Sequence, residues 1–325
     1  MHAATPAPAS SAAAATPVAS TPLWFTPTQK AALKEAQSIW EGVGGVLDQY
    51  GDVMLARTLT VHDWNVKSAK CRAQLESTAR WRNESGAAAV RTRLREEQVT
   101  VARTPHALKV LQSAALLPAL HAAKDHDLMS YAHVGGFDVE KFVSDLADDD
   151  WELFNLWMLE RGQLRVDALS IAQGRLARIK IVQDCEGIGM NVLDRRLLRR
   201  LKRTAPLQDK YYPYLTSGQI VVNAPWFVEG VWNMIKGLLS SELRAQVNIV
   251  GKAGSAAFLQ TVAEASELPN FFGGERTAPP PLTRSILGFD ALETGERDNL
   301  LTSEKARKYR EWVLGPAISA TGVSA

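Results

Sequence analysis

The sequence is poor in the residue types that mark several classes of protein. Only two cysteines occur among 325 residues, Cys71 and Cys185, and they lie far apart with no metal-like spacing. This argues against a disulfide framework and suits a reducing compartment. A net charge of +2 gives no overall attraction to nucleic acid. No run of about 18 apolar residues occurs, so no membrane-spanning helix is expected.

The first 22 residues also lack variety, since Ala, Pro, Ser and Thr make up nearly all of them. Such a segment buries too little apolar surface to offset its ordering entropy. We therefore expect residues 1–25 to form a disordered tail. The alternative is an organelle transit peptide, although residues 1–22 contain no arginine. No basic start with a continuous Leu-rich stretch is present, which excludes a secretory signal.

The first third of the ordered chain reads as helical. Thr26 with Pro27 and Gln29 predicts a capped helix start, and glycines from Gly42 onward end this helix. Three further stretches show helical patterns, whereas residues 86–103 fit either a solvated helix or a loop. The three predicted helices are 52–60, 66–83 with Asn65 as cap, and 105–117 with Thr104 as cap.

Beyond residue 125, strands alternate with helices, which predicts a mostly parallel sheet with helical cover. The predicted strands are 128–134, 177–183, 219–223 and 247–250. The predicted helices are 138–147, 150–173, 191–203, 225–239, 254–266 and 303–314. Three prolines at 279–281 predict a linker before the last of these helices.

The segment from Tyr211 to Gly274 indicates a binding pocket rather than a reaction centre. Two short apolar strands flank a helix that is apolar around most of its circumference, from Trp226 to Leu239. So many large apolar side chains cannot all face one core, and some are expected to face a lipid, a membrane or a neighbouring segment. No set of acid, base and nucleophile accompanies them, so we predict a protein that is not an enzyme and needs no cofactor.

Several short motifs in this order resemble the CRAL-TRIO lipid-transfer family. The motifs that carry the resemblance are Asp63-Trp64-Asn65 through Trp81-Arg82, Ile181 to Ile188 with its Asp184-x-x-Gly187 turn, Tyr212-Pro213, Asn223-Ala224-Pro225, Lys236, and Leu268-Pro269 with Phe272-Gly273-Gly274. The resemblance covers roughly residues 30–275.

The resemblance implies an α/β fold: a helical N-terminal lobe (26–118) and a CRAL-TRIO lobe (119–275) whose mostly parallel sheet floors an apolar lipid pocket. A C-terminal extension with a short helix (276–325) would follow. Helix 226–239 would act as a movable gate. The expected lipid-binding residues are Ile179, Ile181, Tyr212, Tyr214, Val221, Phe227, Val231, Trp232, Ile235, Lys236 and Ile249.

Departures from the family pattern bear on the ligand. Tyr214 stands where phosphatidylinositol-binding members have Glu, and Leu243 and Gln246 replace a Thr and a Lys. Ile179 and Ile181 stand where phosphatidylcholine-binding members place hydroxyls. These differences favour a hydrophobic ligand over phosphatidylinositol. We expect a cytoplasmic monomer that touches membranes transiently and binds no nucleic acid. The alternative is a lipid-sensing interaction module without transfer activity.

Four other features have competing interpretations. Gly187 and Gly189 follow a strand, but Val192 replaces the third glycine of a dinucleotide fingerprint. His121, Asp125, His126 and His133 lack the second compact pair that a metal site needs, which favours a polar surface loop. The basic residues of 195–203 form either a solvated face or a contact for anionic head groups. Lys236 would either stabilise a helix end or contact phosphate.

Overall fold

In the computed structural model, the described residues are 24–238, 241–302 and 304–315. The expected disordered tail lies outside these ranges except for Trp24 and Phe25. Phe25 is buried and packs with Leu33, Trp40 and Leu55 in the core of the N-terminal helices. Trp24 and Phe25, which were assigned to the tail, therefore pack with the N-terminal helices.

The N-terminal lobe is helical, as expected. Its helices are α1 (Pro27–Gly42), α2 (Gly51–Val61), α3 (Ala69–Glu84), α4 (Ala87–Glu96) and α5 (Ala107–Ser113). The Thr26 capping box is confirmed, because the Thr26 hydroxyl accepts from the Gln29 amide and the Gln29 side chain accepts from the Thr26 amide. The cap of α3 is Ser68 rather than Asn65, because Asn65 lies in the turn that follows α2.

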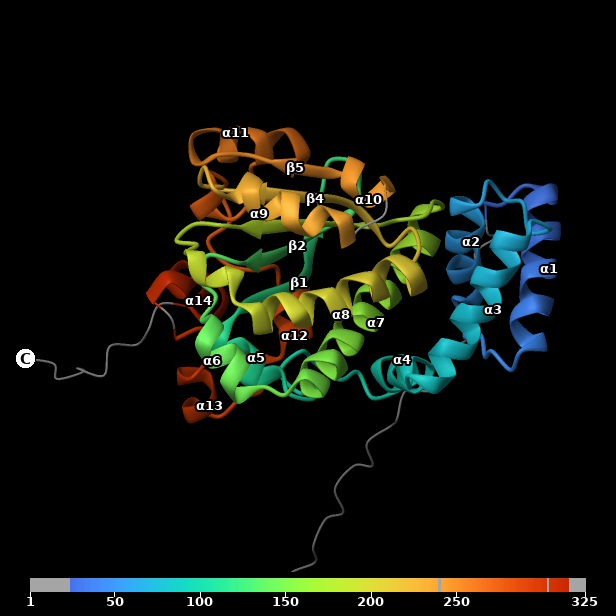
Figure 1. The fold of residues 1–325 in the computed structure, drawn as a ribbon, viewed down its shortest axis with the longest axis horizontal. Helices are drawn as coiled ribbons and strands as arrows, with labels where there is room; N and C mark the ends of the chain where they lie inside the picture. The colour runs from blue at the N-terminus through green and yellow to red at the C-terminus, as the bar shows by residue number, and fades with distance from the viewer. Residues whose placement is uncertain (1–23, 239–240, 303, 316–325) are drawn as a thin grey trace, which may run out of the picture.

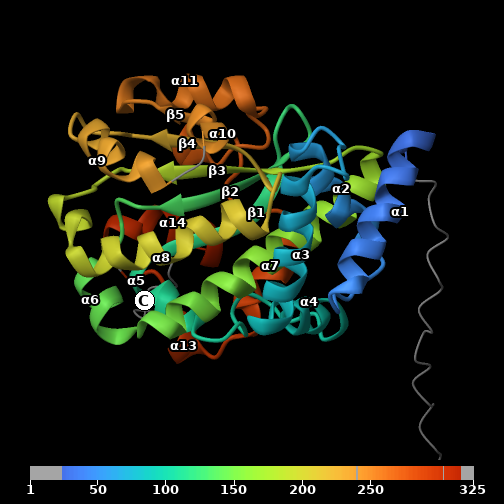
Figure 2. The same ribbon diagram turned by 45° about the vertical axis from the view of Figure 1, so that its right-hand side comes forward.

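A five-stranded sheet forms the centre of the molecule (Figures 1 and 2). Its strands are β1 (Ala115–Ala122), β2 (Leu128–His133), β3 (Ile179–Asp184), β4 (Thr216–Val222) and β5 (Val247–Ile249), and they lie side by side in chain order. β1 pairs antiparallel with β2, and the other neighbours are parallel. The expected mostly parallel sheet is confirmed.

The strand order decides where the connecting helices lie. Parallel strands in consecutive order need crossovers of one hand, so their helices gather on one face of the sheet. These helices are α6 (Val139–Asp145), α7 (Asp148–Gln173), α8 (Arg195–Tyr211), α9 (Val228–Ile235) and α10 (Ser241–Ala245), with the short 3-10 helices η1 (Met190–Leu193) and η2 (Lys236–Leu238). In Figure 1, α8 and α9 lie in front of the sheet.

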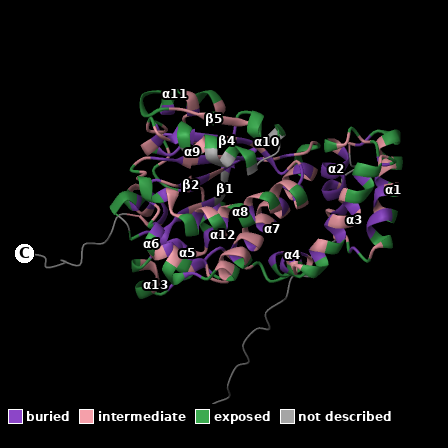
Figure 3. Cartoon of the chain, in the orientation of Figure 1, coloured by how far each residue is buried: buried purple, intermediate pink, exposed green. Residues whose placement is uncertain are grey.

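The C-terminal segment from Lys252 onward covers the opposite face. Its elements are α11 (Lys252–Val262), η3 (Asn270–Phe272), α12 (Pro281–Leu287), η4 (Phe289–Ala291), α13 (Thr294–Asp298), η5 (Glu304–Ala306) and α14 (Arg307–Leu314). Tyr309 and Trp312 of α14 are buried in the same core as Tyr131, Val182 and Ile220. Figure 3 shows this buried core in purple. Residues 276–315 therefore complete the sheet's second face, and Pro281 starts a helix.

One sequence prediction about this region is wrong. Residues 105–117 were expected to be one helix, but α5 starts at Ala107 after His106, and β1 begins at Ala115. Ala and Leu favour helices, yet residues 115–122 pair antiparallel with β2, from Ala115 opposite His133 to Ala122 opposite Leu128, and this pairing overrides that preference. β1 also runs across residues 118 and 119, where the sequence placed a domain boundary.

None of the helices within the described ranges combines the length and apolar character that crossing a bilayer requires.

Candidate functional site

A cavity of about 360 Å³ lies between the sheet and the helices of its first face. This volume falls in the range of small-molecule sites. The wall is largely apolar. Its residues come from the five strands, from the loop that follows β2, and from helices α6 to α9. The lining residues are Leu116, Ala132, His133, Val134, Phe137, Phe142, Trp151, Gln183, Cys185, Ile188, Val192, Leu197, Leu198, Leu201, Ala205, Gln219, Val221, Val228, Trp232, Val247 and Ile249.

The register of the parallel strands builds the floor. Ala132, Gln183, Val221 and Ile249 are successive partners across β2, β3, β4 and β5, so their side chains point to the same face. Gln219 lies two residues before Val221 and shares that face. The Gln183 amide nitrogen donates to the Gln219 side-chain oxygen at 2.7 Å. The floor is thus apolar except for one bonded pair of carboxamides.

The cover comes mainly from α8 and α9. Leu197, Leu201 and Ala205 recur every four residues along α8 and line the cavity, because that spacing places them on one helix face. Val228 and Trp232 have the same spacing on α9. These side chains place apolar helix surfaces over an apolar floor.

The titratable groups in the wall are neutral at pH 7. Burial, aided by the nearby Asp184 carboxylate, raises the pKa of Cys185 to about 12, so its thiol keeps its proton. Burial also lowers the pKa of His133 below its usual value, and the neighbouring carboxylates only partly oppose this. No lining residue of the cavity, among those the structure describes, is Asp, Glu, Lys or Arg.

Asp184 ends β3 and ties together three segments at the carboxyl edge of the sheet. Its carboxylate is fully buried and accepts from Asn223 Nδ2 at 2.7 Å and from the Tyr309 hydroxyl at 3.0 Å. Lys308 Nζ lies 2.6 Å from the same carboxylate. The Asn223 backbone N–H donates to Ser255 Oγ. Asp184 and Asn223 thus brace the turns beside the cavity and do not line it.

The comparisons with known proteins agree with this architecture. Residues 119–274 match the family model of the CRAL/TRIO domain. Over 98 residues the chain is 26% identical to the "Sec14 cytosolic factor" of Schizosaccharomyces pombe, and the match covers 30% of this chain and 34% of that protein. The chain contains a CRAL/TRIO domain. The match spans about a third of the length of that relative.

A solved structure supports the fold of the CRAL/TRIO domain and its helical lobe. The crystal structure of Sfh5 superposes with a TM-score of 0.55 at 14% identity, covering 73% of this chain and 84% of that chain. At that identity the likeness concerns the fold alone. The resemblance to the CRAL-TRIO family is confirmed by the family model and the curated relative.

The structure brings some of the expected site residues to the cavity of the CRAL/TRIO domain. Val221, Trp232 and Ile249 line it. Phe227 packs with Val228 beside it. Val231 and Ile235 belong to α9, but their side chains lie outside the described part of the structure. Their contacts with a lipid stay predictions.

The other expected site residues do not line this cavity. Ile179 and Ile181 pack with Tyr212 in a separate apolar cluster, because the near end of β3 faces α7 and α3. Tyr214 has a positive φ of 57° and carries the Arg178 guanidinium 4.6 Å from its ring centroid. Lys236 is exposed and donates to Asn233 Oδ1.

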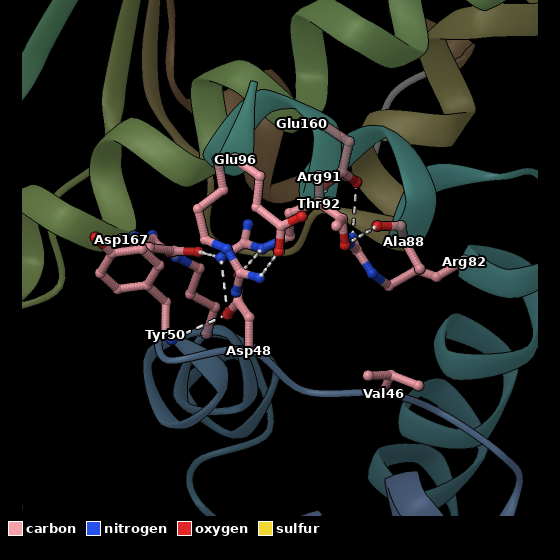
Figure 4. A network of polar contacts seen from close by, with 12 residues as sticks. Val46, Asp48, Tyr50, Arg82, Ala88, Arg91, Thr92, Glu96, Glu160 and Asp167 are labelled. Atoms are coloured by element: carbon pink, nitrogen blue, oxygen red, sulfur yellow. Dashed lines mark hydrogen bonds and ion pairs between the residues drawn. The ribbon is translucent and has the colours of Figure 1, made fainter. Parts of the chain in front are cut away.

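Tyr212 belongs to a buried polar network that joins the helical lobe to the CRAL/TRIO domain. Its hydroxyl donates to Glu160 at 2.6 Å, and Arg82 binds both oxygens of Glu160 at 2.8 Å. Next to it, Asp167 of α7 accepts from Arg57 at 2.8 Å and from Arg91 at 2.9 Å. Figure 4 shows Glu160, Asp167, Arg82 and Arg91 of this network. The network fixes α2, α3 and α4 to α7.

The polar features with competing interpretations are largely structural. Several cationic side chains of α8 meet acids: Arg196 pairs with Glu140, and Arg200 and Arg203 pair with Asp148. This pairing favours the solvated face. His121 and His133 are buried rather than in a surface loop, since β1 and β2 carry them into the core. No group of three possible metal ligands occurs among the described residues.

Functional lining residues that the sequence did not single out are Gln183, Gln219 and the stripe of α8. Gln183 lies two residues after Ile181, so period-two alternation in β3 already placed it on the same face. The apolar stripe of Leu197, Leu201 and Ala205 is interspersed with the six basic residues of 195–203. The sequence interpretation considered only those charges and not the apolar face.

Proposed function

We propose that this protein binds one apolar, lipid-like molecule in the 360 Å³ cavity and exchanges it at membranes. The observation that carries the proposal is the wall itself. The cavity is lined mainly by leucines, valines, isoleucines and aromatic rings, without a charged side chain among the described residues, which suits binding of an apolar molecule. It offers a site where about 0.8 kcal/mol is gained for each methylene removed from water.

The gate in this proposal is the segment from Trp226 through η2. Helix α9 has eight residues and is followed directly by the three residues of η2, so this cover is short and interrupted. Gly230 and Gly237 are exposed, with no atom within 4 Å of an added Cβ, so both positions face open space. A short, partly exposed helix opens at a lower free-energy cost than the buried sheet.

Membrane contact is proposed at the same edge. Trp226 precedes α9 and is 91% exposed, and Met190 of η1 is 60% exposed. Both follow the carboxyl ends of adjacent parallel strands, beside Ile188 and Val228 of the cavity wall. Indole rings favour the interface between water and acyl chains. The relative named Sec14 cytosolic factor is compatible with a cytoplasmic protein of this kind.

Replacement of Trp232 tests the proposal. Trp232→Asp introduces a carboxylate into the wall, and a buried ion without a partner costs several kcal/mol. We expect the affinity for a pyrene-labelled long-chain alcohol to fall on the order of 100-fold or more. Trp232→Phe keeps an apolar ring and should retain binding within roughly tenfold.

The readout is pyrene fluorescence on titration, with circular dichroism as the check of folding. A folded Trp232→Asp protein that binds the probe like the wild type would contradict the assignment of the cavity. Leu287, Tyr309 and Trp312 of the C-terminal extension belong to the core, so deletion of residues 276–325 should unfold the protein.

A further inference from the structure

The floor of the cavity contains one polar feature, the Gln183–Gln219 pair. The two carboxamides lie on neighbouring parallel strands and join through the 2.7 Å hydrogen bond from Gln183 to Gln219. Both side chains line the cavity. Their placement in an otherwise apolar floor is costly unless each polar atom has a hydrogen-bond partner. A ligand with a polar group therefore gains most binding free energy by placing that group against this pair.

The chemistry of the pair limits what that group is. A primary carboxamide offers two N–H donors and an oxygen with two lone pairs. The mutual bond engages one N–H of one residue and one lone pair of the other, which leaves capacity for both donation and acceptance. Exchange of the two amide orientations does not alter this balance. A group that both donates and accepts, such as a hydroxyl or an amide, matches the pair better than an ether or a hydrocarbon.

The wall also disfavours a charged group. A phosphate or carboxylate placed here would be removed from water without a cation, since no lysine or arginine is among the lining residues described. No cationic residue of α8 is among the described lining residues. Arg200, for example, binds Asp148 and the backbone carbonyls of Phe142, Val143 and Leu146. Burial of an unpaired ion costs several kcal/mol.

We infer that Gln183 and Gln219 select a neutral ligand, a long apolar molecule with a single hydroxyl or amide that docks between the two carboxamides. This inference rests on the proposed function, because it names the class of molecule that the same cavity takes. It makes the Gln pair a specificity-determining element and the apolar wall the source of affinity.

The test compares three ligands of equal chain length, hexadecanol, hexadecane and hexadecanoate, as competitors of the pyrene-labelled alcohol. The wild type should bind hexadecanol most tightly. In the double variant Gln183→Leu/Gln219→Leu, whose floor has similar volume and no polar group, the preference for hexadecanol over hexadecane should fall roughly tenfold, the value of a good neutral hydrogen bond. Gln37→Leu in α1 is the control for the same chemical change away from the cavity.

Two results would overturn the inference while leaving the proposed function intact. One is an alcohol-to-alkane preference that is the same in the double variant and the wild type. The other is a wild type that binds hexadecanoate more tightly than hexadecanol. Failure of the wild type to bind the pyrene probe at all would refute the proposed function itself. If the double variant does not fold, the single Gln219→Leu variant should show a smaller reduction in the preference for hexadecanol over hexadecane.

Discussion

Tyr212 gives a direct test of which residues hold the fold and which meet the ligand. Its hydroxyl donates to Glu160 at 2.6 Å, and the side chain is buried away from the cavity. Tyr212→Phe keeps the ring, which stands edge-on to Trp81 at 5.8 Å, and removes only this hydrogen bond. Glu160 retains both bonds from Arg82, so no buried charge loses its ion pair.

The expected loss of stability in Tyr212→Phe follows from the charge of the Glu160 acceptor. A hydrogen bond to an ionised group contributes about 1.5–3 kcal/mol, and we expect the free energy of unfolding to fall by that amount. The affinity for the pyrene-labelled alcohol should change by no more than roughly twofold, since Tyr212 does not line the cavity. Urea titration followed by circular dichroism measures the first quantity, and probe fluorescence measures the second.

The neighbouring tyrosine supplies a matched control. Tyr211 stacks on Trp81 with centroids 4.0 Å apart and is half-buried, and its hydroxyl has no hydrogen-bond partner among the described residues. Tyr211→Phe should alter the free energy of unfolding by no more than about 0.5 kcal/mol. The reasoning would be refuted by a Tyr212→Phe variant of unchanged stability and weakened probe binding, because that result would place the hydroxyl against the ligand.

Two further predictions concern stability. Burial alone would raise the pKa of Asp184, but the Lys308 ammonium and the Asn223 side-chain amide hold this pKa below its usual value. The ionised carboxylate therefore adds to the free energy of unfolding above the unfolded pKa of about 4, and this stabilisation is lost as pH falls through the lower folded pKa. The difference in free energy of unfolding between wild type and Asp184→Asn should therefore narrow from pH 7 toward pH 3; a constant difference in urea titrations would contradict this. An added Cβ at Gly135 would lie 1.8 Å from the Glu186 carbonyl oxygen, so Gly135→Ala should lower the free energy of unfolding by at least about 1–3 kcal/mol. Gly230→Ala in α9, where an added Cβ meets no atom within 4 Å, should raise the free energy of unfolding by up to about 1 kcal/mol. Thermal melts of the two variants measure both changes; the same change in stability for both would show that the close approach at Gly135 does not constrain the backbone.

The sequence predicts those parts of the fold that local patterns specify. The capped start of α1 and the strands β2 to β4 depend on side-chain chemistry and periodicity within a few residues. β1 was missed because its Ala- and Leu-rich sequence favours a helix, and only pairing with β2 makes it a strand. Helix α8 was expected to end near residue 203 but continues through Pro206 to Tyr211; packing of α8 against α7 and α3 offsets the roughly 3 kcal/mol cost of an interior proline.

The candidate site was predictable to the extent that it follows strand alternation. Val221 and Ile249 were expected at the pocket from the family resemblance, and both line the cavity; strand alternation accounts for the face they share. Ile179 and Ile181 share their face, yet they lie at the end of β3 that α3 and α7 cover. The extent of a cavity along a strand depends on which helix lies above each residue, and local sequence does not specify that arrangement. The roles of Asp184 and Tyr212 depend on partners in α14 and α7, more than 50 residues away for each contact.

The most direct test of the account identifies what the protein carries. The full chain would be purified from a eukaryotic host, extracted with organic solvent, and the extract compared by mass spectrometry with that of a folded Trp232→Asp variant. The account predicts a stoichiometric neutral molecule with a long apolar body in the wild type and its loss from the variant. An equal amount of the same lipid in both proteins, or a stoichiometric phosphatidylinositol in the wild type, would contradict it.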